Sequence, residues 1–114
     1  MRYPVIRVVA SHEDKKIPIT ALLDTGAIGC VIHKDIAEEL GCLEKLKSKI
    51  VGIGVAGLTE IEEVCHTDLE IDGEILSVKC LVSSTLPDDI HIIIGRDLIN
   101  ESPTLEEYLK KKFY

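Results

Sequence analysis

The chain has 114 residues, of which 46% are hydrophobic, and a formal net charge of −7 at pH 7. This length fits a single domain, residues 1–114, with enough apolar residues for a real core. The chain is too short for most two-domain enzymes, so an active site built from two halves would need a second copy of the chain. The negative charge argues against nucleic acid and anionic membranes as partners. No stretch approaches the roughly 20 apolar residues of a membrane span, and no signal-peptide pattern follows Met1. We therefore expect a soluble, cytoplasmic protein.

Two β-rich runs near the start of the chain, residues 5–10 and 17–23, flank a polar turn and predict a hairpin. A short strand is expected at residues 31–32. Residues 35–40 place apolar side chains on one helical face, and the following Gly41 is a common residue at helix ends, so a short helix is predicted here.

The middle of the chain predicts strands joined by tight turns. Residues 49–51 lead into a glycine-rich segment, residues 52–57, and a long stretch of polar and apolar residues extends over 58–71. Asp72-Gly73 is a strong signal for a two-residue hairpin turn, and residues 75–83 provide the returning strand.

The last third of the chain predicts one more strand and two helices. An apolar strand over residues 90–94 leads into Gly95, after which a short helix begins. Ser102 and Pro103 fit the N-cap and the first position of a final helix over residues 104–112. The balance is mainly β, and strands at short spacing with tight turns favour a closed or sandwich-like β architecture.

The tripeptide Asp24-Thr25-Gly26 lies between two apolar runs, residues 21–23 and 31–32. Burying a lone carboxylate costs several kcal/mol unless it is hydrogen-bonded or neutralised, so chains rarely place one there for stability. Thr25 adds a hydroxyl, and Gly26 lets the backbone turn or approach a partner closely. The alternative is a solvated turn between two strands, but the apolar flanks favour a functional carboxylate.

Gly52-x-Gly54-x-x-Gly57 matches the dinucleotide-binding fingerprint, which has to open a helix whose N-terminus holds the pyrophosphate. No clear amphipathic helix follows, and the remaining chain is too short for a paired nucleotide fold. We therefore favour a glycine-rich hairpin tip that moves over a cleft.

The cysteines and histidines show no spacing typical of a metal site, and no metal is expected. The cysteines are spread out in apolar settings without a Cys-x-x-Cys pair, which favours buried free thiols over a disulfide framework. The histidines are expected on the surface or in structural roles. The residues concerned are Cys30, Cys42, Cys65, Cys80, His12, His33, His66 and His91.

Three motifs in order along the chain resemble the retropepsin family, the retroviral-type aspartic proteases that work as homodimers. Residues 21–27 look like the family's catalytic block, residues 52–54 like its flap tip, and residues 93–98 like the strand–Gly–helix element that supports the catalytic loop. The likeness covers roughly residues 5–99, and three ordered motifs are far more specific than any one of them.

The resemblance implies a small closed β-barrel in which Asp24 faces Asp24 of a second copy at the axis of a homodimer. Such a pair holds one proton and titrates as a unit. The ionised carboxylate activates a water that attacks a peptide carbonyl, and the protonated one stabilises the oxyanion and helps protonate the leaving nitrogen. The resemblance therefore implies an aspartic endopeptidase with peptide or protein substrates and no cofactor.

The same resemblance implies roles for residues around Asp24. Thr25 would lock the two loops across the dimer axis, and Gly26 would support the site and contact substrate backbone. Ala27, Ile53 and Gly54 would contact substrate, the last two from the flap.

This sequence departs from the retroviral pattern in two places. The acidic residue that pairs with the counterpart of Arg96 in the retroviral enzymes is replaced here by Ile28, so Arg96 needs another partner, either Asp97 or a group from the second subunit. The interleaved terminal strands that hold the retroviral dimer have no counterpart either, since the chain ends in a predicted helix. It is more like a cellular or prokaryotic relative than a viral enzyme.

Two alternatives remain open on sequence alone. The fold could serve as a binding or assembly module in which Asp24 is retained but cleavage is weak or absent. The final helix, with Leu105, Tyr108 and Leu109 at helical spacing, could pack on its own barrel or replace the missing terminal strand in holding the dimer.

Overall fold

The computed structural model describes residues 4–54 and 57–113. In chain order its elements are β1 (Val5–His12), β2 (Lys15–Leu23), β3 (Cys30–His33), α1 (Lys34–Leu40), β4 (Leu43–Gly54), β5 (Gly57–Ile71), β6 (Glu74–Ser83), β7 (Ile92–Ile94), α2 (Arg96–Ile99) and α3 (Pro103–Phe113). The expectation of a mainly β chain with a short helix after Gly95 and a C-terminal helix is confirmed.

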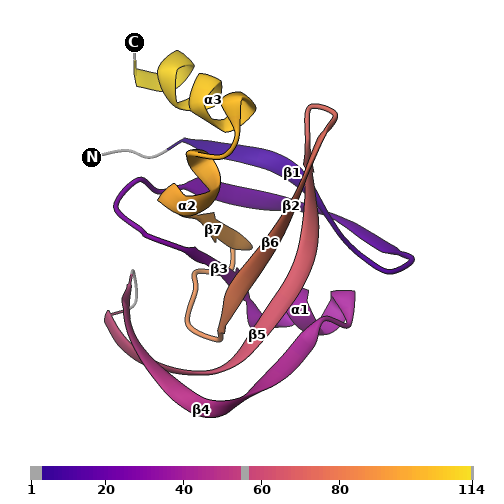
Figure 1. Ribbon diagram of the computed structural model, residues 1–114, viewed down its shortest axis with the longest axis vertical. Coiled ribbons are helices and arrows are strands. Elements are labelled where there is room, and N and C mark those ends of the chain that lie inside the picture. The colour runs from indigo at the N-terminus through magenta and orange to yellow at the C-terminus, as the bar shows by residue number, and fades with distance from the viewer. Residues whose placement is uncertain (1–3, 55–56, 114) are drawn as a thin grey trace.

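The strands form a closed barrel with one strand left outside it (Figure 1). Their order in the sheet is β1-β2-β7-β3-β6-β5-β4, and β1 also pairs with β5 over residues 9–11 and 68–70, which closes the ring. β4 pairs with β5 and is the edge strand. Most neighbours are antiparallel, but β7 runs parallel to β2, and β3 runs parallel to β6.

Apolar side chains at alternate positions along the strands fill the interior of the barrel. On β1 the buried residues are Ile6, Val8 and Ala10, with exposed or half-buried residues between them. All three residues of β7 are buried, as expected for a short apolar strand with neighbours on both sides. The interior is therefore a packed core of side chains.

The tight turns follow their local sequences. Asp72 and Gly73 have positive φ values of 50° and 86°, the conformation that an Asp-Gly hairpin turn requires. α1 ends at Gly41 in the left-handed conformation, and its first turn is capped by His33, whose Nδ1 accepts a hydrogen bond from the N–H of Asp35. The turn and the helix end predicted from the sequence are both confirmed.

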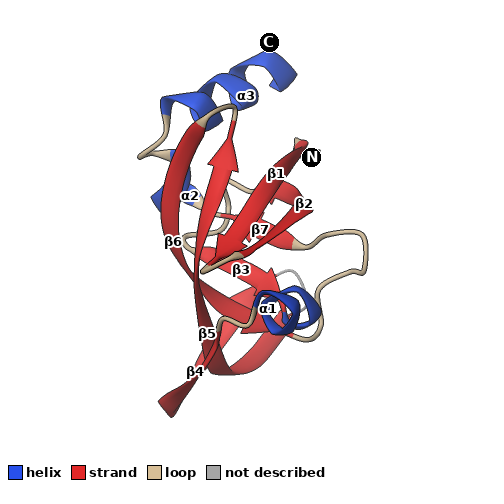
Figure 2. Cartoon of the chain, turned by 90° about the vertical axis from the view of Figure 1, so that its right-hand side faces the viewer, coloured by secondary structure: helices blue, strands red, loops and turns tan. Residues whose placement is uncertain are grey.

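The C-terminal helix α3 packs against its own barrel. Leu105 is fully buried in the core, and Tyr108 and Leu109 are half-buried against it. Ser102 caps the helix, because its hydroxyl accepts a hydrogen bond from the N–H of Leu105 at 3.1 Å. The Tyr108 hydroxyl donates to Asp72 at the β5–β6 turn, at 2.7 Å. Figure 2 shows α3 beside that turn, so the first of the two packing arrangements left open by the sequence is the one observed.

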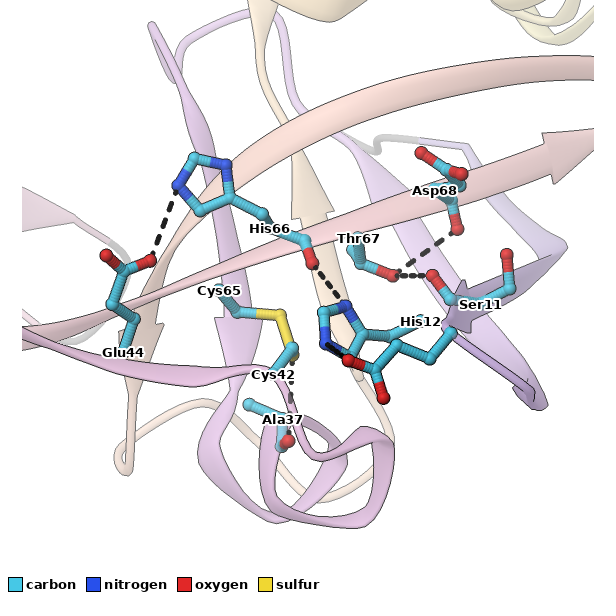
Figure 3. The surroundings of a disulfide bond; sticks show 10 residues. Ser11, His12, Ala37, Cys42, Glu44, Cys65, His66, Thr67 and Asp68 are labelled. Carbon is cyan, nitrogen blue, oxygen red and sulfur yellow. Dashed lines mark hydrogen bonds and ion pairs between the residues drawn. A yellow bond between two sulfur atoms is a disulfide. The ribbon is translucent and has the colours of Figure 1, made fainter.

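The expectation of four free thiols is wrong for one pair of cysteines. Cys42 and Cys65 form a disulfide, with Cα atoms 5.0 Å apart (Figure 3), whereas Cys30 and Cys80 are buried free thiols. The pairing depends on tertiary structure: Leu43 at the start of β4 lies opposite Cys65 in the sheet, which brings the adjacent Cys42 within reach. Nothing in the spacing along the sequence marks this proximity.

No helix in the described part of the chain is long and apolar enough to cross a lipid bilayer.

Candidate active site

Asp24 stands at the point where β2 leaves the barrel. The preceding Leu23 is fully buried and pairs with Ile94 of β7. The N–H of Asp24 donates to the carbonyl oxygen of Ile94 at 3.0 Å, which extends the β2–β7 ladder by one residue. The apolar strand β2 thus holds the Asp24 carboxylate at a fixed place, at the end of the parallel pair of β2 and β7.

The carboxylate is oriented by its own turn. Asp24 Oδ1 accepts a hydrogen bond from the N–H of Gly26 at 2.9 Å, and the N–H of Ala27 donates to the carbonyl oxygen of Asp24 at 3.1 Å. This is the local side-chain-to-backbone pattern that Asp favours in turns. Asp24 is half-buried rather than fully buried, so its desolvation cost is smaller than the apolar flanks suggested.

The strand–Gly–helix element supports the loop that follows Asp24. Arg96 N–H donates to the carbonyl oxygen of Ala27 at 2.8 Å, and Asp97 N–H donates to that of Ile28 at 3.0 Å. Gly95 lies directly under the loop, since a Cβ placed on it would be 2.3 Å from the carbonyl oxygen of Gly29. The loop can rest this closely on the support only because Gly95 has no side chain.

The loop presents its outer side to solvent. Thr25 and Gly26 are exposed, Ala27 is half-buried, and Ile28 is 66% exposed. A rigid backbone with an accessible carboxylate is an arrangement that can bind and activate water or a substrate carbonyl.

The β4–β5 hairpin carries the glycine-rich segment. Ile53 pairs with Leu58 and Gly54 pairs with Gly57, while Val55 and Ala56 at the tip lie outside the described residues. The segment connects two antiparallel strands rather than a strand and a helix, so the dinucleotide-binding interpretation is wrong. Figure 1 shows the end of this hairpin on the same side of the barrel as the connection from β2 to β3.

Arg96 does not form an ion pair with Asp97, the first partner that the sequence suggested for it. Within the described residues, neither Asp97 nor another carboxylate lies within the 4.0 Å of an ion pair with it, and both Arg96 and Asp97 are exposed. The first of the two partners considered for Arg96 is therefore not observed.

The histidines have the structural roles expected of them. His91 Nδ1 accepts the N–H of Thr20 at 2.9 Å where β2 meets β7, and His33 caps α1. Over residues 4–54 and 57–113, no group of three or more His, Cys, Asp or Glu side chains is arranged to hold a metal ion. A surface cavity of about 490 Å³ between the end of β1 and the middle parts of β5 and β6 includes His12 and His66 in its lining but no residue of the Asp24 loop.

Sequence reasoning missed the backbone groups that hold the loop. The carbonyl oxygens of Ile94, Ala27 and Ile28 accept the supporting hydrogen bonds, and any residue type could provide them. Such contacts leave no signal in residue identity, whereas Gly95 does, because a glycine next to an apolar strand can mark a close backbone approach.

A closed β-barrel with an Asp-Thr-Gly loop resting on a strand–Gly–helix support defines the class of retropepsin-like aspartic proteases. The family model described as retroviral aspartyl protease matches residues 2–105. The chain belongs to this family.

Solved structures agree with this fold. The EIAV protease, in a complex with the inhibitor HBY-793, superposes with a TM-score of 0.61 at 24% identity, over 88% of each chain. A Legionella pneumophila protein of unknown function superposes with a TM-score of 0.52 at 16% identity, over 82% of this chain and 83% of the other. Among curated proteins, no sequence match is found.

Proposed function

We propose that the chain is an aspartic endopeptidase that acts as a homodimer, with residues 1–114 working as one domain in the cytoplasm. The observation that carries this proposal is the geometry of Asp24: a single carboxylate, held by its own turn and by β7, on a loop open to solvent. The loop contributes one catalytic carboxylate per chain, and the dyad mechanism needs two, so the second would come from Asp24 of another copy.

In the proposed dimer the two Asp24 carboxylates lie in contact and share one proton. The ionised member accepts a proton from water as the water attacks the scissile carbonyl carbon. The protonated member donates a hydrogen bond to the carbonyl oxygen as it gains charge, and a proton then passes to the leaving nitrogen as the C–N bond breaks. Protons are returned to the pair, and no covalent enzyme intermediate forms.

The neighbouring residues would position the substrate. Thr25 and Gly26 support the carboxylates where the two loops meet, and Ala27 lies beside the substrate backbone. Ile53 and Gly54 would contact the substrate from the β4–β5 hairpin, acting as a flap whose antiparallel edge offers backbone N–H and C=O groups to an extended peptide.

A second candidate function is a binding or assembly module with weak or no cleavage. One observation favours it: α3 packs on its own barrel rather than providing a terminal strand for a partner. This packing could leave the two loops without the interface that aligns Asp24 with its symmetry mate.

Cleavage of a peptide library at acidic and neutral pH, with wild type and Asp24→Asn compared, tests the proposal. Because the substitution removes the ionisable oxygen from both members of the pair, we expect cleavage to fall by about 10²–10⁴-fold. Asp89→Asn, which changes an exposed carboxylate away from the loop, is the matched control and should cleave like wild type.

Sedimentation of the same proteins separates the two candidate functions. A dimeric Asp24→Asn protein without activity, beside an active wild type, supports the endopeptidase. A wild type that dimerises without cleaving any peptide supports the binding module. Activity in Asp24→Asn close to that of wild type would rule out the dyad mechanism.

A further inference from the structure

The β4–β5 hairpin leaves the barrel at a single well-defined place. β6 pairs with β5 only from Val64 to Ile71, so the part of β5 before Val64 has β4 as its only strand neighbour within the described residues. The Cys42–Cys65 disulfide lies at this point of departure, with Cys65 fully buried and Cys42 nearly so. The base of the projecting hairpin is therefore covalently joined to the barrel core.

A break in the strand pairing follows directly beyond this base. Lys45 pairs with Glu63, and the next pair is Ile50 with Ile61, so residues 46–49 of β4 face only Glu62 of β5. Bulges of this kind interrupt the ladder of hydrogen bonds and bend the strand that carries them. The distal pairs, from Ile50–Ile61 to Gly54–Gly57, are thereby separated from the anchored base.

One side chain bridges the break. Lys49 Nζ lies 3.1 Å from Glu62 Oε1 and 3.3 Å from Glu60 Oε2, and hydrogen bonds to Glu62 and Glu60 raise the pKa of Lys49. These exposed ion pairs are weak contacts that form and break easily in water. The hairpin thus has a rigid base, a bulged segment closed by one lysine, and a distal part that carries Ile53 and Gly54.

We propose that residues 46–49 form a hinge for the distal β4–β5 hairpin and that the Cys42–Cys65 disulfide confines the hairpin's movement to this hinge. Where the hairpin serves as the substrate flap, which rests on the function proposed above, the disulfide positions the flap and reduction weakens substrate binding. The hinge gives the movement a defined axis, and the covalent base keeps that axis fixed relative to the Asp24 loop.

The local structure accommodates the reduced state. Cys42 Sγ lies 3.6 Å from the carbonyl oxygen of Ala37 (Figure 3). In the disulfide this sulfur has no hydrogen, so the approach is a van der Waals contact, whereas a Cys42 thiol could donate a hydrogen bond to the same oxygen. Reduction by an external dithiol balances. Its thiolate attacks one sulfur of the disulfide and releases the other cysteine, and its second thiol then attacks the mixed disulfide, which releases the first cysteine and leaves the dithiol oxidised to a cyclic disulfide. Two electrons and two protons thereby pass to Cys42 and Cys65.

The two remaining thiols do not compete for this pairing. Cys80 lies directly opposite Cys65 in the sheet, and Cys30 lies opposite Cys80. Burial raises the pKa of both thiols, which lowers the fraction of the thiolate form that attacks a disulfide. Exchange of these thiols with the Cys42–Cys65 bond is therefore slow at neutral pH.

Thiol titration and hydrogen exchange test the proposal without relying on catalysis. Two thiols should react in denatured, unreduced protein and four after reduction with dithiothreitol. Reduction, or the double change Cys42→Ser and Cys65→Ser, should speed amide exchange at the hairpin base, residues 43–45 and 63–65, by about tenfold, which corresponds to about 1.4 kcal/mol. Cys80→Ala, which leaves the disulfide intact, should respond to dithiothreitol as wild type does.

Lys49→Gln tests the hinge separately and needs no change in the core. It should speed exchange in the distal pairs, residues 50–54 and 57–61, while the base stays protected. Four reactive thiols before reduction, or equal exchange rates in oxidised and reduced protein, would overturn the proposal, as would loss of protection at the base in Lys49→Gln.

In active protein, reduction should raise KM by about tenfold with a smaller change in kcat. An unchanged KM alongside faster exchange would overturn the link to substrate binding. If no peptide is cleaved in either redox state, the proposed endopeptidase function fails, and the exchange rates still decide whether the hinge exists.

Discussion

Gly95 is the residue on which the geometry of the Asp24 loop depends most directly. A methyl group at this position would lie 2.3 Å from the carbonyl oxygen of Gly29 and 2.9 Å from that of Ala27, both of them backbone atoms that cannot rotate away. Gly95→Ala should therefore displace the loop and lower the free energy of unfolding by about 1–3 kcal/mol. Denaturant unfolding measures the stability loss, and peptide cleavage measures the displacement.

The same loop provides a matched control for Gly95→Ala. A Cβ added at Gly29 meets no atom within 4 Å, so Gly29→Ala should change the unfolding free energy by no more than about 0.5 kcal/mol. If the two alanine variants were equally stable, the close approach at Gly95 would not hold the loop.

Residue identities predicted the Asp24 loop better than its support. The Asp24-Thr25-Gly26 tripeptide indicated a carboxylate at the end of an apolar strand, whereas only the family resemblance, and no property of the glycine itself, pointed to Gly95 as part of the supporting element. The Cys42–Cys65 disulfide escaped detection, since the two residues are separated by 23 positions and meet only through the pairing of β4 with β5.

Ser102 joins the C-terminal helix to the β5–β6 hairpin. Its hydroxyl accepts the N–H of Leu105 at the start of α3 and donates to Glu74 Oε1, and the residue is fully buried. Ser102→Ala removes the N-cap and leaves Glu74 without this donor, so the free energy of unfolding should fall by about 1–2 kcal/mol. Thermal or denaturant unfolding is the measurement.

Tyr108→Phe is the matched control for that prediction. The Tyr108 hydroxyl donates to Asp72 in an exposed position, where water can replace it. The stability change should therefore be smaller than that of Ser102→Ala. The reverse order would mean that the helix is held mainly by its tyrosine and not by its buried cap.

Local sequence patterns predicted the helices and strands well, with the exception of one strand segment. The hairpins, α1, β7 and α3 follow from alternation, turn residues and caps, which act over a few neighbouring positions. The first half of β4 was missed, because residues 43–49 are rich in lysine and belong to an edge strand with a break in pairing. Such a strand is defined by its partner β5 more than by its own side chains.

For the molecule as a whole, the proposed dyad makes activity depend on protein concentration. A dimer with one carboxylate from each chain loses activity when it dissociates, so activity per chain should fall as the protein is diluted below the dimer dissociation constant. A dilution series assayed beside sedimentation equilibrium measures both quantities. Constant activity per chain in a sample that sediments as monomer would contradict the shared site.

The parallel pairing of β2 with β7 also has a consequence for the order of events during synthesis. Asp24 is made early, but the hydrogen bonds that seat its strand reach far along the chain; Thr20 and His91, for example, are 71 positions apart. A nascent chain that has not yet released β7 and Gly95 from the ribosome cannot hold the Asp24 loop in place. Contacts this distant in sequence also slow folding, so the carboxylate becomes organised only after β7 and Gly95 have been made. If the chain is the endopeptidase proposed above, a growing polypeptide would thus be unable to cut its neighbours before β7 and Gly95 have left the ribosome.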